Sequence, residues 1–523
     1  MWRVEDESFV FMEEDYYLKI SKVSDLKNPK ERILYRLLEI FPGALSWATL
    51  ILVVFLSWKL PLFVAIFIIF FVLYWFFRTI YFSFHLRSGY KKMRENEKID
   101  WMEKLPKLPG KNWQNIYHLI ILPMYKEPFE IVRASFLSLM NCDYPKEKMI
   151  LVLACETRAK DYAKEIAGKI EKEFGKKFFK FLVTWHPKNL EGEIAGKGAN
   201  ETFAAKKVKR EIIDSLKIPY ENIICSSFDI DTMVFPRYFS CLTWYYLTCE
   251  KPTRTSFQPI PLFINNIWEA PSFSRVFAFS STFWHTMNQE RPEKLITFSS
   301  HSMSFQALVE VGFRQTDVVS DDSRIFWQCF LKYDGDYKVQ PIFYPISMDA
   351  NCVKSFWKTL LNIYKQQRRW AYGVADIPYF LLGFLKNKKI PLSGKISLGW
   401  ELIEGHWSWA TASFLIFLLG WLPLILGGSE FTQTLLSYNL PRIVSWVLTL
   451  SMVGLVSSAY FSILLLPPRP PEYGKSKYFI LFVQWFFLPL VMIFFTALPA
   501  LDAQTRLMLG KYMGFWPTEK FRR

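Results

Sequence analysis

Five uncharged apolar stretches constrain this chain more than any other feature of its sequence. They cover residues 41–58, 60–77, 407–428, 443–468 and 478–501. A helix needs roughly 20 apolar residues to cross a bilayer, so each stretch is a candidate membrane span. With 51% of its 523 residues hydrophobic and 21% charged, the chain is neither a disordered polymer nor a small disulfide-stapled module. The sequence predicts an integral membrane protein.

The apolar stretches divide the chain into six parts. We expect an N-terminal segment at 1–40, a transmembrane hairpin at 41–86, a globular domain at 87–350, amphipathic interface helices at 351–400, C-terminal transmembrane helices at 401–501 and a basic tail at 502–523. Between the second and third apolar stretches, strand-like and helix-like patterns alternate instead. A large globular domain is therefore expected between the membrane helices.

Positively charged flanks orient the spans, because short loops rich in Lys and Arg stay in the cytoplasm. Such residues gather in 1–40 and again after the second span, from Arg78 to Arg94. We expect a protein of the cell inner or plasma membrane with its globular domain in the cytoplasm. Five crossings would place the tail outside, whereas its basic residues favour the inside. Pro489 and Pro499 leave a bent or re-entrant last element open.

The charge balance points to anionic partners. The chain has 64 Lys and Arg against 48 Asp and Glu, a formal charge of +16, which suits a lipid bilayer surface or an anionic small-molecule substrate. No basic run interleaved with aromatics stands out, so we expect no nucleic acid partner. Seven cysteines include no C-x-x-C pair, which leaves a zinc or haem site unsupported.

The first half of the globular domain shows a regular alternation of patterns. Strands are predicted at 116–125, 149–156, 178–186 and 222–231, and helices at 129–141, 158–175 and 197–216. This spacing predicts βαβ units, hence an α/β domain with a mostly parallel central sheet. Ligands of such sheets bind at the carboxyl ends of the strands. Chemistry is therefore expected just after each strand.

Asp229 and Asp231 stand at the end of the fourth predicted strand. Two carboxylates one residue apart at a strand end can share a divalent ion, Mg²⁺ or Mn²⁺, that also binds a diphosphate. The alternative is a solvated loop or a helix-cap pair. The position at a strand end, rather than the D-x-D spelling, favours the metal.

A second acidic pair, Asp321 and Asp322, stands near a predicted helix start. Acidic residues there are good helix caps and interact favourably with the helix dipole. The functional alternative is that one carboxylate acts as general base and removes a proton from an attacking hydroxyl.

The segment 354–370 has the apolar spacing of an amphipathic helix with Lys and Arg on its other face. Such a helix suits the membrane interface. It ends in Gln366-Gln367-Arg368-Arg369-Trp370. An arginine beside an indole can bind a leaving diphosphate while the ring stacks on a sugar.

These three elements, in this order and between membrane helices, resemble the processive branch of the family 2 glycosyltransferases, which contains cellulose, hyaluronan and chitin synthases. The resemblance implies a GT-A-like nucleotide-sugar-binding domain. The segment LPMYKEP resembles the family's first strand and loop, with Lys126 in place of an Asn and Glu127 kept. Glu156 stands where the family has a nucleotide-binding Asp, and Lys197 lies in a GKGAN segment that resembles the family's Lys-plus-Asn segment.

The resemblance also implies roles. Donor binding falls to Glu127, Glu156, Lys197 and Asp229, metal binding to Asp231 with Asp229, general-base catalysis to Asp322, and acceptor or diphosphate binding to His301, Gln366, Arg369 and Trp370. The implied cofactor is Mg²⁺ or Mn²⁺, and the implied donor is a UDP- or GDP-sugar.

We expect an inverting sugar transfer to a glycan acceptor that builds a β-linked polysaccharide. The alternative is transfer of one sugar to a lipid acceptor, because the Gln-x-x-Arg-Trp segment also occurs in enzymes that glucosylate lipids once. An inactive membrane scaffold or transporter is a third hypothesis, against which stand the acids and the Arg-Trp pair.

Overall fold

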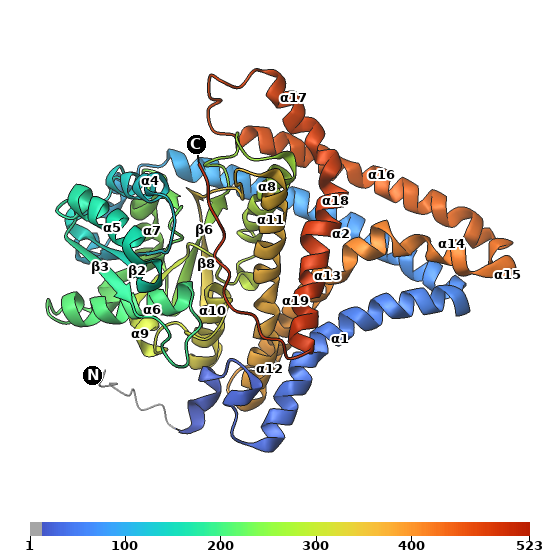
Figure 1. Ribbon diagram of the computed structural model, residues 1–523, viewed down its shortest axis with the longest axis horizontal. Coiled ribbons are helices and arrows are strands. Elements are labelled where there is room, and N and C mark those ends of the chain that lie inside the picture. The colour runs from blue at the N-terminus through green and yellow to red at the C-terminus, as the bar shows by residue number, and fades with distance from the viewer. Residues whose placement is uncertain (1–12, 523) are drawn as a thin grey trace.

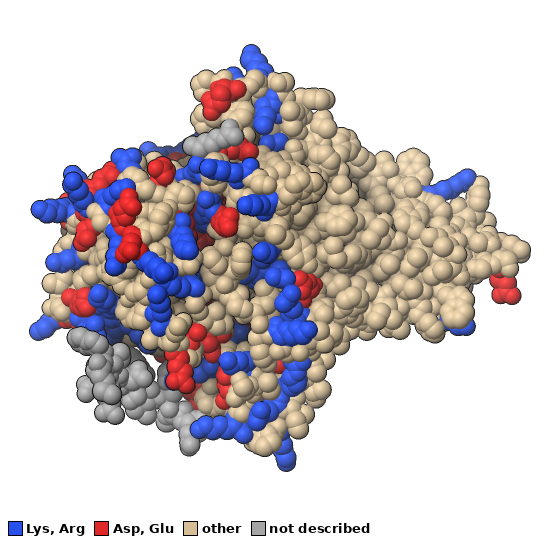
Figure 2. Space-filling model, in the orientation of Figure 1, with Lys and Arg blue, Asp and Glu red and all other residues tan. Residues whose placement is uncertain are grey.

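The computed structural model describes residues 13–522. Residues 1–12 and 523, which belong to the predicted N-terminal segment and basic tail, lie outside the described residues. The described chain forms an α/β domain and an arm of apolar helices that projects from it (Figure 1). The charged side chains gather over the domain, whereas the visible face of the arm is almost free of them until its far end (Figure 2).

The α/β domain is built on one sheet. Its strands are β1 (Tyr117–Met124), β2 (Met149–Glu156), β3 (Lys180–His186), β4 (Ile223–Ser227), β5 (Met233–Val234), β6 (Thr255–Leu262), β7 (Ser302–Ser304) and β8 (Lys338–Ser347). They lie in the order β3-β2-β1-β4-β7-β6-β8-β5. Strands β3, β2, β1 and β4 are parallel neighbours, as are β6 and β8. Strand β7 pairs antiparallel with β4 and with β6, and β5 pairs antiparallel with β8. The predicted α/β class with a mostly parallel sheet is confirmed.

The predicted alternation in the first half of the domain is also confirmed. Its helices are α4 (Phe129–Met140), α5 (Lys160–Phe174) and α6 (Lys197–Val208). Helices α4 and α5 cover one face of the sheet and α6 the other, so β2 is buried at every position. The helix expected at 197–216 is shorter than predicted, because the α-helix ends at Val208 and a π-turn follows.

The second half of the domain adds helices around the strand ends. They are α7 (Tyr238–Thr248), α8 (Ser272–Asn288), α9 (Phe305–Glu310), α10 (Asp321–Lys332), α11 (Phe356–Ala371) and α12 (Asp376–Lys386). Helix α11 is the amphipathic helix predicted at 354–370. It exposes Phe356, Trp357 and Leu361 and buries Thr359 and Asn362 toward the domain. This exposed apolar face is the one that the predicted membrane interface requires.

The arm consists of α1 (Pro29–Lys59), α2 (Pro61–Lys98), α13 (Leu392–Phe417), α14 (Leu422–Leu426), α15 (Gly428–Thr432) and α16 (Leu435–Leu464). By length and hydropathy, α1, α2, α16 and the helical run Ser476–Met508 could each cross a membrane, and α13 with α14 would make a fifth span bent by 49°. The five predicted spans are thus five apolar helical segments. The first two extend well past the predicted hairpin, since α2 continues to Lys98.

Both described ends of the chain lie against the α/β domain. Near the N-terminus, Asp15 pairs with Lys332 of α10 at 2.9 Å. At the other end, Lys520 pairs with Asp231 and Arg522 with Asp349. If both ends lie on one side of a membrane, the chain crosses it an even number of times, so at least one of the five apolar segments does not cross.

The last helical run, Ser476–Met508, differs from the other apolar segments because turns interrupt it twice. It comprises α17 (Ser476–Val483), α18 (Leu488–Met492) and α19 (Leu498–Met508), joined by a 3₁₀ turn and a π-turn. The turns precede Pro489 and Pro499, each of which lacks the N–H of a regular helix. Helices α18 and α19 run across the domain end of the arm rather than along it (Figure 1). Helix α19 packs on α1, α13 and the domain's α11.

Candidate active site

A cavity of about 1120 Å³ lies where the carboxyl ends of β1, β2 and β4 meet α10, α11 and the arm. Nine of the ten residues that the sequence predicts for the site line this cavity. They are Glu127, Glu156, Lys197, Asp229, Asp231, Asp322, Gln366, Arg369 and Trp370. The fold thus gathers segments from across the domain, while the roles assigned to these residues stay predictions.

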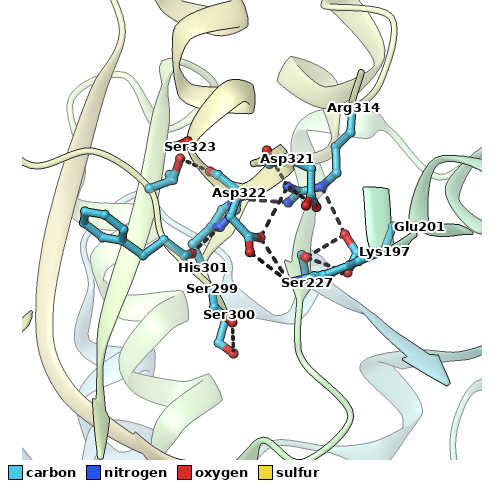
Figure 3. Close-up of polar contacts among 12 residues, drawn as sticks. Lys197, Glu201, Ser227, Ser299, Ser300, His301, Arg314, Asp321, Asp322 and Ser323 are labelled. Carbon is cyan, nitrogen blue, oxygen red and sulfur yellow. Dashed lines mark hydrogen bonds and ion pairs between the residues drawn. The ribbon is translucent and has the colours of Figure 1, made fainter. Parts of the chain in front are cut away.

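The Lys197 ammonium joins acids from distant parts of the chain, of which Figure 3 shows Asp322. Its Nζ lies 2.9 Å from Asp229 Oδ1 and 3.0 Å from Asp322 Oδ1. Lys197 begins α6 and Asp322 lies in the first turn of α10. Asp229 lies in the loop after β4, because that strand ends at Ser227, earlier than predicted. One ammonium therefore holds two of the predicted motifs together.

The close approach of α6 to α10 requires a residue without Cβ. A Cβ on Gly198 would lie 2.8 Å from Asp321 Cβ and 3.3 Å from the Gln315 carbonyl oxygen. Atoms this close repel, so a larger residue would push α10 and its acids away. The glycine after Lys197 thus sets the distance across the site.

The charges around Lys197 shift pKa values in opposite directions. Burial would lower the pKa of Lys197, but Asp229 and Asp322 outweigh it and raise that pKa well above its ordinary value. Burial would raise the pKa of Asp229, yet Lys197 and Lys520 bring it well below its ordinary value. The Ser299 hydroxyl also donates a hydrogen bond to Asp229 Oδ2 at 2.7 Å. At neutral pH, Asp229 is therefore a carboxylate and Lys197 an ammonium.

A second layer of buried charge, which sequence reasoning missed, lies behind this ion pair. Glu201 follows Lys197 by one turn of α6, and its carboxylate accepts a hydrogen bond from the Ser227 hydroxyl at 2.7 Å. Arg314 Nε lies 3.2 Å from Glu201 Oε2, and Arg314 Nη1 lies 3.7 Å from Asp322 Oδ1. Arg314 therefore links the back of α6 to the start of α10 (Figure 3).

His301 does not have the place that the resemblance implies. It is completely buried and is absent from the described residues that line the cavity. Burial and the Arg314 charge lower its pKa to about 3, so the ring is neutral. Its Nδ1 lies 2.7 Å from the Phe298 carbonyl oxygen and its Nε2 lies 2.9 Å from Arg314 Nη2. His301 therefore contacts Arg314 rather than lining the cavity, and the acceptor contact implied for it stays a prediction.

The neighbouring acids Asp321 and Asp322 have different environments. The Asp321 side chain is 4% exposed and that of Asp322 is 24% exposed. Burial and the neighbouring Asp322 carboxylate raise the pKa of Asp321 to about 8. Asp322 instead lies beside Lys197 and Arg314. Of the two neighbouring acids, Asp321 is thus the buried one that holds its proton more tightly, and Asp322 is the more accessible one.

Asp231 pairs with a different acid from the one predicted. Its neighbour is Asp349, in the loop after β8, whose N–H donates to Asp231 Oδ2 at 3.1 Å. Burial and Asp231 raise the pKa of Asp349 to about 6, and Asp349 Oδ2 has no hydrogen-bond partner. Asp229 is instead engaged by Lys197.

The residues present fit a divalent metal ion at Asp231 and Asp349. Two buried carboxylates and an unpartnered oxygen provide hard oxygen ligands, and a diphosphate and water would complete the shell. No group of three or more His, Cys, Asp or Glu residues that could by itself hold a metal ion occurs within residues 13–522. The cations of Lys520 and Arg522 lie against these two acids.

The predicted donor-side acids lie at the ends of β1 and β2. Glu127 Oε2 accepts a hydrogen bond from the Tyr125 N–H at 2.7 Å, and burial raises the pKa of Glu127. Glu156 ends β2 and pairs with Arg158, whose Nη2 lies 2.8 Å from Glu156 Oε1. Arg158, which the sequence did not single out, also lies over the Tyr125 ring and lines the cavity.

Helix α11 brings its last turn to the other side of the cavity. Gln366 Oε1 accepts a hydrogen bond from Asn351 at 3.0 Å. The buried Arg369 Nε has no hydrogen-bond partner. Trp370 packs beside Phe263 and Phe277, with ring centroids 6.3 and 5.8 Å away. Arg369 therefore brings an unused donor to the cavity, and Trp370 closes one wall.

Sequence patterns carried little signal for the residues that were missed. Glu201 stands four residues after Lys197 on one helix face, a spacing at which Lys and Glu side chains interact. Asp349 follows β8, a strand outside the predicted alternation. Arg314 and Lys520 reach the site only through contacts between distant segments.

Comparisons with known proteins give distant structural similarity. No protein-family model matches the chain, and no curated protein matches it in sequence. Among solved structures, a mannosyltransferase, PcManGT from Pyrobaculum calidifontis in complex with GDP-Man and Mn²⁺, is 12% identical with a TM-score of 0.41, over 82% of this chain and 98% of that one. S. aureus TarS 1–349 in complex with UDP-GlcNAc is 10% identical with a TM-score of 0.37, over 76% and 93%.

Proposed function

We propose that this protein is a membrane glycosyltransferase that transfers a sugar from a nucleoside diphosphate sugar. The observation that carries the proposal is the ion cluster in which Lys197 holds Asp229 and Asp322 at 2.9 and 3.0 Å. Arg369 and the acid pair Asp231 and Asp349 line the same cavity. A carboxylate base, cations for a diphosphate and a divalent-metal subsite are the groups that such a transfer needs.

The donor is proposed to bind at the strand ends, with its nucleoside toward Glu127 and Glu156 and its diphosphate toward Arg369. Bound at Asp231 and Asp349, Mg²⁺ or Mn²⁺ would neutralise diphosphate charge. Arg369 would supply further positive charge where the leaving group becomes more anionic. This charge lowers the barrier for breaking the bond between the sugar and the diphosphate.

Asp322 is proposed as the general base. It is the accessible member of its pair, 24% exposed against 4% for Asp321. It would take the proton of the acceptor hydroxyl as that oxygen forms a bond to the anomeric carbon and the bond to the diphosphate breaks. Attack from the face opposite the leaving group inverts the configuration. A diphosphate would also draw Lys197 away from Asp322 and free the carboxylate.

The cavity extends from these acids into the arm. Its lining includes Val72 and Thr79 of α2, Ala412 of α13, and Leu448 and Met452 of α16. Met452 is 44% exposed, so the cavity reaches the apolar surface of the arm. An acceptor that enters along this wall would come from the bilayer.

Beyond the cavity, the far end of the arm is filled. Val64 and Ile68 of α2 pack with Leu440 and Val444 of α16 in one buried apolar cluster, each at most 3% exposed. A growing polysaccharide would need a path through this cluster, whereas a lipid acceptor would not. The filled end favours transfer of a sugar to a lipid acceptor, with synthesis of a β-linked polysaccharide as the second candidate function.

The test is incubation of the protein in native membranes with a panel of radiolabelled UDP- and GDP-sugars, with the product sorted into lipid and polymer fractions. We expect one donor to label the lipid fraction. Asp322→Asn should lower the rate by about 10²–10⁴-fold and leave nucleotide binding in place, because only the base is lost.

Asp161→Asn is the matched control, since Asp161 lies on α5 with its side chain 95% exposed. Its rate should equal that of the wild type. Label in the polymer fraction would favour the second candidate, and no transfer from any donor would refute the proposal.

A further inference from the structure

Residues 510–522 form a segment that lies across the cavity. It follows α19 and passes in front of β8 and β6 in the view of Figure 1. Phe515, Pro517, Thr518, Glu519 and Lys520 line the cavity. The segment therefore forms part of the active-site wall, although the sequence predicted only a basic tail there.

The cationic end of the segment lies on the proposed metal ligands. The Lys520 ammonium pairs with Asp231 Oδ1, and Arg522 Nε donates to Asp349 Oδ1 at 2.7 Å. The acid side chains are 2% and 3% exposed, whereas those of Lys520 and Arg522 are 17% and 14% exposed. The acids are thus deep and fixed, and the two cations approach them from the outside.

The rest of the segment is held by the domain as well. The Asn362 side-chain amide donates to the Glu519 carbonyl oxygen at 3.2 Å, and that of Asn266 donates to the Phe521 carbonyl oxygen at 3.1 Å. These amides belong to α11 and to the loop after β6. Backbone carbonyls held by side-chain donors fix the register of the segment and so place Lys520 over Asp231.

Phe515 holds the other end of the segment at the start of α6. A Cβ on Gly196 would lie 2.7 Å from the Phe515 ring, so the ring packs directly on the backbone beside Lys197. The Arg369 guanidinium lies over the Phe515 ring, 4.6 Å from its centroid. The arginine proposed to bind the diphosphate is therefore engaged by the same segment.

We propose that residues 510–522 are an intramolecular competitor for the metal subsite. The Lys520 ammonium and a divalent metal ion compete for Asp231, so docking of the segment and binding of the metal exclude each other. Both carboxylate oxygens of Asp231 are engaged, Oδ1 by the Lys520 ammonium and Oδ2 by the Asp349 N–H. A metal ion at Asp231 would lie so close to the ammonium that the two like charges repel. The inference rests on the proposed function only in placing a divalent metal at Asp231 and Asp349.

The first test titrates the purified full chain with Mn²⁺ alone and measures free Mn²⁺ by electron paramagnetic resonance. Lys520→Ala should bind Mn²⁺ roughly ten- to a hundredfold more tightly than the wild type, the fold-change for loss of one charge-assisted hydrogen bond. Lys511→Ala is the matched control, because it removes an exposed cation from the same segment. Equal or weaker Mn²⁺ binding by Lys520→Ala would overturn the proposal.

The second test needs no substitution. Backbone hydrogen exchange of residues 511–522 in the wild type should become faster when Mn²⁺ is added at saturating concentration, since the segment leaves the site. Unchanged exchange with Mn²⁺ bound would overturn the competition. The tests measure Mn²⁺ binding and docking of the segment, and neither needs a sugar donor. Failure of sugar transfer would therefore refute the proposed function without changing the outcome of these two tests.

Discussion

Removing the Lys197 ammonium should destabilise the α/β domain, because it leaves buried acids without their shared cation. The side chain of Lys197 is 7% exposed, and those of Asp229 and Asp322 are 29% and 24% exposed. Breaking a buried ion pair on one side costs about 3–5 kcal/mol. Solvent at the two acids screens the repulsion, so we expect the lower end, about 3 kcal/mol, for Lys197→Met.

The measurement is thermal unfolding of the protein in one detergent, followed by differential scanning fluorimetry. At about 2–4 °C per kcal/mol for a domain of this size, about 3 kcal/mol lowers the Tm by roughly 6–12 °C. Lys206→Met is the matched control, since Lys206 is exposed on the same helix, and its Tm should stay within a degree or two of the wild type.

A double variant separates charge from packing. In Lys197→Met/Asp322→Asn, one of the unpaired acids is gone, so we expect recovery of about 0.5–3 kcal/mol relative to Lys197→Met alone. A Tm for Lys197→Met equal to that of the wild type would refute the reasoning. So would a double variant no more stable than Lys197→Met, because the loss would then come from packing rather than charge.

Three further predictions follow from the same site. The folded-state pKa of Asp321 is raised from 3.8 to about 8, so the folded protein binds one proton more than the unfolded chain between these pH values. Its stability should therefore fall as pH rises from about 4 to 8. In Asp321→Asn, a plot of Tm against pH should lose up to about 1.4 kcal/mol per pH unit of that slope. Gly198→Ala should lower stability by about 1–3 kcal/mol through contact with Asp321, whereas Gly168→Ala on α5, with open space around it, should raise stability by about 0.5–1 kcal/mol; equal Tm values would contradict the packing argument. Chelation of divalent metal should stop sugar transfer and added Mn²⁺ should restore it; full activity in excess chelator would exclude the metal subsite at Asp231.

Local sequence patterns predicted the apolar helical segments and most strands and helices in the first half of the α/β domain. The strand β2 was predicted with its observed bounds, and β1, α4 and α5 within two residues, because apolar runs and helical spacing reflect burial on a regular scaffold. The helix before β4 was predicted too long, since charged residues after Val208 fit an α-helix and a π-turn equally well.

The site was predicted where function follows from position along a strand or helix. Asp229, Asp322 and Arg369 were selected because they stand just after a strand or in the first or last turn of a helix. All three line the cavity, and their roles stay predictions. The partners that set their charge were not found. Arg314 and Asp349 reach the site through tertiary packing, which no local pattern encodes. The resemblance gave the neighbourhood of His301 but not the direction of its ring, so its burial away from the cavity lining was not predicted.

The extension of the cavity into the arm affects how the protein should behave after extraction into detergent. A detergent monomer has a polar head and an apolar chain, as a lipid acceptor has, and the walls of α2, α13 and α16 would accommodate either. Extraction would then leave a surrogate in the acceptor's place. Kinetics in micelles should show a raised apparent KM for the acceptor and an unchanged KM for the sugar donor, and reconstitution into bilayers should reverse the difference.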